Sequence, residues 1–90
     1  MAVLLVTYDL NKETTRPPLL KDLKETYPTW ARLSESSYAI ETSSTPSQVY
    51  NRLKRHIDDN DNIIVVHLRR PHDGWASKKV HDWLSQKLPY

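Results

Sequence analysis

The sequence predicts a small α+β domain, and three features lead to this prediction. Two short segments, residues 2–8 and 63–68, are almost entirely apolar, which is typical of β-strands buried on both faces. Three other segments carry apolar residues at helical spacing. The chain has 90 residues, enough for one domain spanning residues 1–90.

The first half of the chain is predicted to contain a strand, a helix and two further strands. The strand at 2–8 ends in polar residues, and the helix that follows opens at residues 14–18, where prolines fit the first turn. Pro28 ends this helix because the residue before a proline avoids the helical conformation. Looser alternation then predicts two short strands, at about 30–35 and 37–42, joined by a tight turn. The apolar stripe of the helix comprises Leu19, Leu20, Leu23 and Tyr27.

The second half is predicted to contain a helix, a strand and a last helix. Thr45 and Gln48 have the spacing of a capping box, in which a hydroxyl and an amide satisfy the first backbone groups of a helix. The strand at 63–68 follows a polar turn, and the last helix lies near residues 77–88. The stripe of the earlier helix comprises Val49, Tyr50, Leu53 and Ile57, and that of the last one Val80, Trp83, Leu84 and Leu88.

The predicted order is βαββαβ followed by a C-terminal helix, which is the ferredoxin-like split βαβ arrangement. Its helices usually cover one face of the sheet, yet the strands at 2–8 and 63–68 are apolar on both faces. Either the C-terminal helix or a second copy of the chain must therefore cover the other face. For so small a domain we expect a homodimer.

Composition excludes several classes of protein. The chain has no cysteine, so it has no disulfides, no thiolate zinc site and no cysteine nucleophile. The four histidines show no tight ligand spacing, so they predict no zinc site either. The longest apolar run is too short to cross a membrane. We expect a cytoplasmic protein without a membrane partner.

Charge is distributed unevenly along the chain. The formal net charge is +2, with −1 in residues 1–45 and +3 in residues 46–90. The basic second half is compatible with a polyanionic partner such as RNA or DNA. The candidate phosphate-binding residues are Lys12, Arg16, Arg69, Arg70 and His72. Arg16 precedes a predicted helix, whose first backbone N–H groups favour an anion.

The sequence resembles a known family in the order of its elements. A hydrophobic strand ends in Tyr8-Asp9, a polar loop with Arg16 leads to an amphipathic helix, and residues 36–42 form a strand. A capped, partly basic helix then leads to a second hydrophobic strand over residues 61–68. This pattern resembles the Cas-two family of CRISPR-associated proteins, especially its SinR-like and VapD-like relatives, over residues 2–68.

The resemblance implies a ferredoxin-like homodimer that associates with nucleic acid. It also implies an endonuclease that uses Mg²⁺ or Mn²⁺, with Asp9 matching the family's catalytic and metal-binding aspartate at the end of the first strand. Two copies of this aspartate would approach each other across the dimer interface. An alternative reading is a non-catalytic dimeric adaptor that docks a protein or DNA, in which Asp9 only caps the turn after the strand.

Overall fold

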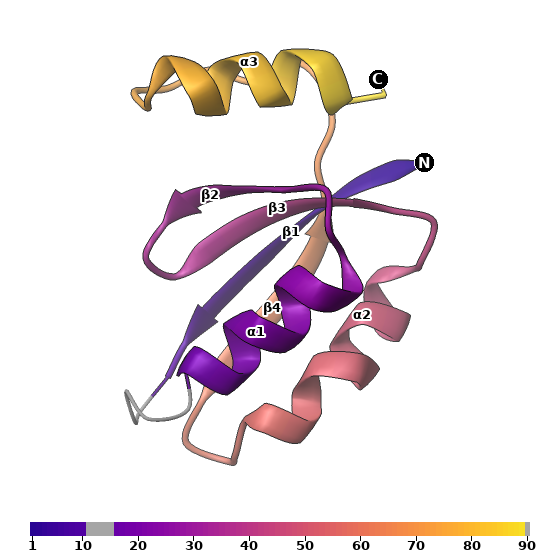
Figure 1. Cartoon of the computed structure of the whole chain (residues 1–90), viewed down its shortest axis with the longest axis vertical. Coiled ribbons are helices and arrows are strands. Elements are labelled where there is room, and N and C mark those ends of the chain that lie inside the picture. Colours follow the sequence, from indigo (N-terminus) through magenta and orange to yellow (C-terminus); the bar gives the residue numbers. More distant parts are fainter. Residues whose placement is uncertain (11–15, 90) are drawn as a thin grey trace.

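The structure, a computed structural model, describes residues 1–10 and 16–89. Over this range the fold is a four-stranded antiparallel sheet with helices on both faces (Figure 1). The elements are, in chain order, β1 (Ala2–Asp9), α1 (Arg16–Thr26), β2 (Trp30–Ser34), β3 (Ser37–Thr42), α2 (Pro46–Leu53), the short 3-10 helix η2 (Lys54–His56), β4 (Asn62–His67) and α3 (Lys78–Lys87). The strand order across the sheet is β2-β3-β1-β4, so β1 lies between β3 and β4.

The local signals read from the sequence are present in the structure. Pro17 and Pro18 lie in the first turn of α1, while residues 14 and 15 of the predicted helix opening lie outside the described residues. The capping box of α2 is complete: the backbone N–H of Gln48 donates to Thr45 Oγ1 (3.2 Å), and that of Thr45 donates to Gln48 Oε1 (2.9 Å). The helices and strands therefore begin close to where the sequence predicts them.

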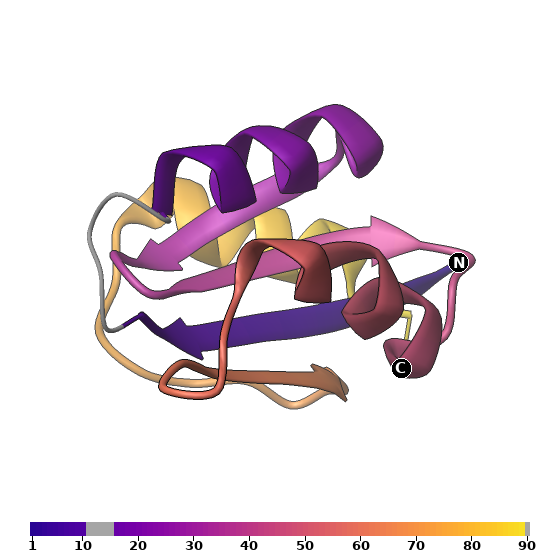
Figure 2. The same cartoon turned by 90° about the horizontal axis from the view of Figure 1, so that it is seen from below.

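The main core lies between the sheet and the pair α1 and α2, which pack on the same face (Figure 2). Alternation along β1 sends Leu4, Val6 and Tyr8 into this core. Leu23 of α1 and Leu53 of α2 are completely buried against them. The stripes predicted for these two helices thus supply this core, except that Tyr50 remains 42% exposed and Ile57 is only half-buried.

The helix α3 covers part of the opposite face. Leu84 and Leu88 pack against Val3 and Ala39 in a second, smaller core, and Figure 2 shows α3 behind β2 and β3. Trp83, which the sequence predicted to be buried, is only half-buried. It lines a cavity at the β2 edge with Trp30 and Pro28.

The remaining part of the second face carries an apolar strip without cover from any described element. The open strip consists of Leu5 and Thr7 on β1 and their Cα partners Val66 and Ile64 on β4. Ile64 is 57% exposed and Val66 is 40% exposed, so β4 is not buried on both faces as predicted. The reason is the position of α3, which packs over β2, β3 and the start of β1 and leaves β4 at the far edge. None of the described helices combines the length and the apolar character needed to cross a membrane.

The packing of α2 predicts the effect of shortening Leu53. Leu53→Ala is expected to lower the free energy of unfolding by about 2–5 kcal/mol, because it leaves a cavity among buried neighbours. Tyr50→Ala, on the exposed side of the same helix, is the matched control and should cost much less. Urea unfolding measures both. Equal midpoints for the two variants would show that the buried face of α2 has been misidentified.

Candidate functional site

Asp9 lies at the rim of a cleft at the C-terminal end of β1. The side chain is exposed, and its Cα partner on β4 is Asn62. The turn between β2 and β3 is held beside it by Tyr8, whose backbone N–H donates to the Ser36 carbonyl (2.9 Å) and whose hydroxyl donates to the Glu35 carbonyl (2.9 Å). The cleft has a volume of about 480 Å³ and is lined by Thr7, Tyr8, Asp9, Leu10, Glu35, Ser36, Asn62 and Ile64.

The cleft lining supplies oxygen ligands of the kind that Mg²⁺ prefers. Asp9 and Glu35 carry carboxylates and Asn62 an amide oxygen. Mg²⁺ is usually held by one or two carboxylates, with waters and substrate phosphates completing its shell. Within residues 1–10 and 16–89, no three His, Asp or Glu side chains are grouped closely enough to hold an ion by themselves. The donor set of one chain therefore fits a weakly held, hydrated Mg²⁺ rather than a closed protein cage.

The cleft adjoins the open strip. Because side chains alternate along a strand, Asp9 lies on the same side of β1 as Leu5 and Thr7. Thr7 and Ile64 belong both to the open strip and to the lining of the cleft. Anything that packs on the open strip will therefore sit next to Asp9.

Two of the candidate phosphate-binding residues, Lys12 and Arg16, follow β1 in the chain. Arg16 is the first residue of α1, and Figure 1 shows this helix beginning at the end of the molecule where β1 ends. Lys12 lies outside the described residues. The backbone thus brings the start of α1 toward the Asp9 end of the sheet.

Two further candidate phosphate-binding residues, Arg69 and Arg70, follow β4 at the end of the sheet opposite to Asp9. β4 runs antiparallel to β1, and the backbone N–H of Leu68 donates to the carbonyl of Val3 (2.9 Å). Arg69 and Arg70 therefore follow the strand away from Asp9. The guanidinium of Arg70 donates from Nε to the carbonyl of Leu88 (2.9 Å) and from Nη2 to that of Ser85. This arginine caps the last turn of α3, where carbonyl groups lack helical partners.

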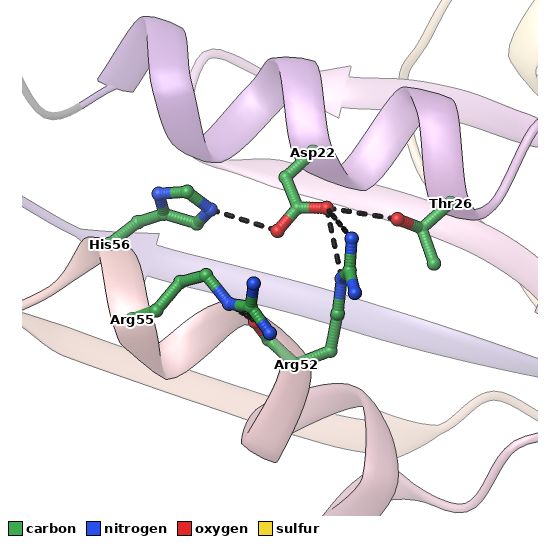
Figure 3. Close-up of polar contacts among 5 residues, drawn as sticks. All are labelled: Asp22, Thr26, Arg52, Arg55 and His56. Carbon is green, nitrogen blue, oxygen red and sulfur yellow. Dashed lines mark hydrogen bonds and ion pairs between the residues drawn. The ribbon is translucent and has the colours of Figure 1, made fainter.

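A polar cluster that sequence reasoning missed joins α1 to α2 and η2 (Figure 3). Asp22 accepts hydrogen bonds from Arg52 Nε (3.1 Å) and Nη2 (3.0 Å) and from the Thr26 hydroxyl (2.9 Å), all at Oδ1. Its other oxygen, Oδ2, lies 2.8 Å from His56 Nε2. Asp22 and Thr26 are four residues apart on one helix, but Arg52 and His56 are remote in sequence, so no motif signals the cluster.

The chemistry of the cluster favours a structural role. An aspartate that orients a histidine is part of hydrolase triads, which also need a nucleophile bonded to that histidine. Here the hydroxyl in the cluster, that of Thr26, bonds Asp22 instead. Burial by itself raises the pKa of Asp22, but the hydrogen bonds from His56, Thr26 and Arg52, with the charge of Arg52, outweigh it and hold the pKa below its usual value. We call this cluster the Asp22 clip, because its hydrogen bonds join α1 to α2 and η2.

Comparison with known proteins finds a similar fold among solved structures. No protein-family model matches the chain, and no curated protein does. Among solved structures, the crystal structure of a hypothetical protein, TT1823, from Thermus thermophilus is similar with a TM-score of 0.68 and 18% sequence identity. The match covers 84% of this chain and 92% of that one. At this identity the similarity shows a shared fold alone.

The Asp22 clip predicts an acid-dependent loss of stability. Because the folded-state pKa of Asp22 is lowered, its carboxylate stabilises the fold above the unfolded pKa of about 3.9, and this contribution is lost as the pH falls through the folded-state pKa. Asp22→Asn should therefore cost about 1–3 kcal/mol at pH 7 and progressively less below about pH 4.

Urea unfolding of both proteins at neutral and acidic pH measures this difference. Asp82→Asn is the control, since Asp82 pairs with Lys78 at an exposed site on α3 and should leave the urea midpoint nearly unchanged. A cost for Asp22→Asn that stays constant from neutral to acidic pH would contradict the assignment.

Proposed function

We propose that this chain forms a cytoplasmic homodimer that associates with nucleic acid and cleaves phosphodiester bonds with the help of Mg²⁺ or Mn²⁺ at Asp9. The proposal combines the resemblance to the Cas-two family with the position of Asp9 at the end of β1. Asp9 is proposed to be both the catalytic and the metal-binding residue. RNA and DNA are both candidate substrates.

The fold that we propose for this function is ferredoxin-like. The elements follow one another as β1, α1, β2, β3, α2 and β4, and α3 is an addition at the C-terminal side. The two central strands of the sheet are β1 and β3, with β4 and β2 outside them. Both orders agree with the split βαβ arrangement expected from the sequence.

The observation that carries the proposal is the contact between the Asp9 cleft and the open strip. An exposed apolar strip on a small sheet favours a second copy of the chain, since burial of apolar surface drives association. Asp9 points to the side of the sheet that this copy would occupy. A two-fold axis near the cleft would bring two Asp9 carboxylates together and complete a ligand set that one chain supplies only in part.

The roles of the residues follow from this arrangement. Asp9 from both copies would hold the ion, and Glu35 and Asn62 of the same cleft are in a position to hold its waters. When bound, the ion would polarise a phosphoryl oxygen and lower the pKa of a coordinated water. Arg16 and Lys12 would contact neighbouring phosphates, which makes binding sensitive to salt.

Dimer formation is tested by placing a charge in the open strip. Ile64→Lys should weaken self-association at least about tenfold, because the ammonium group would be buried without a partner. Trp75→Lys is the matched control, since it replaces another exposed apolar side chain outside the strip. Sedimentation over a range of micromolar concentrations measures both. Native protein that remains at 10.6 kDa throughout would contradict the proposed dimer.

Catalysis is tested by removing the charge of Asp9. Asp9→Asn keeps the shape of the side chain but loses the negative charge that holds a divalent ion, so cleavage should disappear. The experiment measures cleavage of labelled RNA and DNA with Mg²⁺, Mn²⁺ or EDTA, and Asp82→Asn should retain full activity.

A binding titration at two salt concentrations separates catalysis from association. Nucleic acid should bind Asp9→Asn as tightly as the native protein or slightly more tightly, because a negative charge is lost. Cleavage that survives in Asp9→Asn would contradict the assignment of Asp9. A native protein that neither cleaves nor binds nucleic acid would leave the non-catalytic protein-docking adaptor as the better account.

A further inference from the structure

We propose that His72 and His81 form a binding site for a divalent transition-metal ion of the zinc class. His72 belongs to the segment between β4 and α3, and His81 lies near the start of α3. They are nine positions apart in the sequence, and the fold brings His81 Nδ1 to 3.4 Å from His72 Nε2. The two rings are stacked, with centroids 5.5 Å apart and planes at 26°.

The distance between the two nitrogens suits a shared ion. Zn²⁺ binds imidazole nitrogens at about 2.0–2.1 Å in tetrahedral geometry, so two such nitrogens lie about 3.3–3.4 Å apart. The pair already has a separation of 3.4 Å. In the absence of a metal, one ring can donate its proton to the other, and an ion that enters between them replaces this proton.

The surroundings define which ion would bind. Both imidazoles line a cavity of about 280 Å³, whose wall includes the apolar side chains of Leu68, Val80 and Leu84. The charged residues of its lining are Asp73 and Arg69. On α3, Lys78 and Asp82 pair with each other at 2.7 Å. Imidazole nitrogen favours Zn²⁺, Ni²⁺ and Cu²⁺ over Mg²⁺ and Ca²⁺, so this site differs chemically from the oxygen-lined cleft at Asp9.

The proposed site has two protein nitrogens, and water would complete its coordination. Asp73 Oδ1 accepts the backbone N–H of Gly74 (2.8 Å), which orients that side chain within the segment. With only two histidine ligands, the site would bind zinc more weakly than closed four-ligand sites do. A bound ion would fasten the segment 71–76 to the first turns of α3, whose last turn is already held by Arg70.

Zinc titration of the full chain tests the proposal. Calorimetry with ZnCl₂ should give one ion per chain for the native protein and for His67→Gln, a control with an exposed histidine at the end of β4. His72→Gln and His81→Gln should each bind at least tenfold more weakly. A tenfold excess of Mg²⁺ should not compete. Equal affinity in all four proteins, or no binding by the native chain at millimolar zinc, would overturn the site.

A second measurement uses the native chain and does not depend on the folding of a variant. Diethyl pyrocarbonate modifies accessible imidazoles, and mass spectrometry locates the modified residues. Zinc should slow the modification of His72 and His81 together at least fivefold and leave that of His67 unchanged. Equal protection of all the histidines, or protection of none, would show that zinc binds elsewhere or not at all.

Discussion

The structure depends on one constraint: the sheet is apolar on both faces, and the described helices of one chain cover only part of them. Both faces need cover because of the central strand β1. Its Val3, Leu4 and Val6 side chains point to both sides of the sheet and are completely buried. The helices α1 and α2 cover one face, and α3 covers the part of the other that lies over β2 and β3. What remains open is the strip on β1 and β4, where Ile64 is 57% exposed.

This incomplete cover connects the fold to the proposed chemistry. Asp9 stands at the end of the open strip, so the contact that would bury apolar surface would also gather carboxylates. Stability and activity would then depend on the same interface, as is common when a small domain works as a dimer. The region around α3 has a different chemistry, because Arg70 caps the last turn of this helix and two imidazoles lie close together at its first turns. The two candidate metal sites thus have different lining residues and prefer different ions.

Much of the fold could be predicted from local patterns. Prolines at the start of α1, the Thr45 capping box and the apolar strands depend on neighbouring residues alone, and the structure has each of them. The coverage of β4 could not be predicted, because the exposure of Ile64 depends on where α3 packs rather than on the strand's own sequence. The same limit applies to polar sites. Asp22 meets His56 across 34 positions, and His72 meets His81 only because the chain reverses before α3. For the site, the sequence indicated Asp9 through its place at a strand end, but gave no sign of Glu35 in the same cleft.

The central claim is that a second copy packs on the open strip and brings two Asp9 residues together. The chain contains no cysteine, so Asp9→Cys would introduce a single thiol whose reactions report one position only. Treatment of this variant with a short bis-maleimide at micromolar protein concentration, followed by denaturing electrophoresis, tests the distance between the two copies directly. The account predicts a covalent dimer with Asp9→Cys and almost none with Asp82→Cys, an exposed site on α3 away from the strip. Monomer from both variants, or equal cross-linking of both, would contradict it.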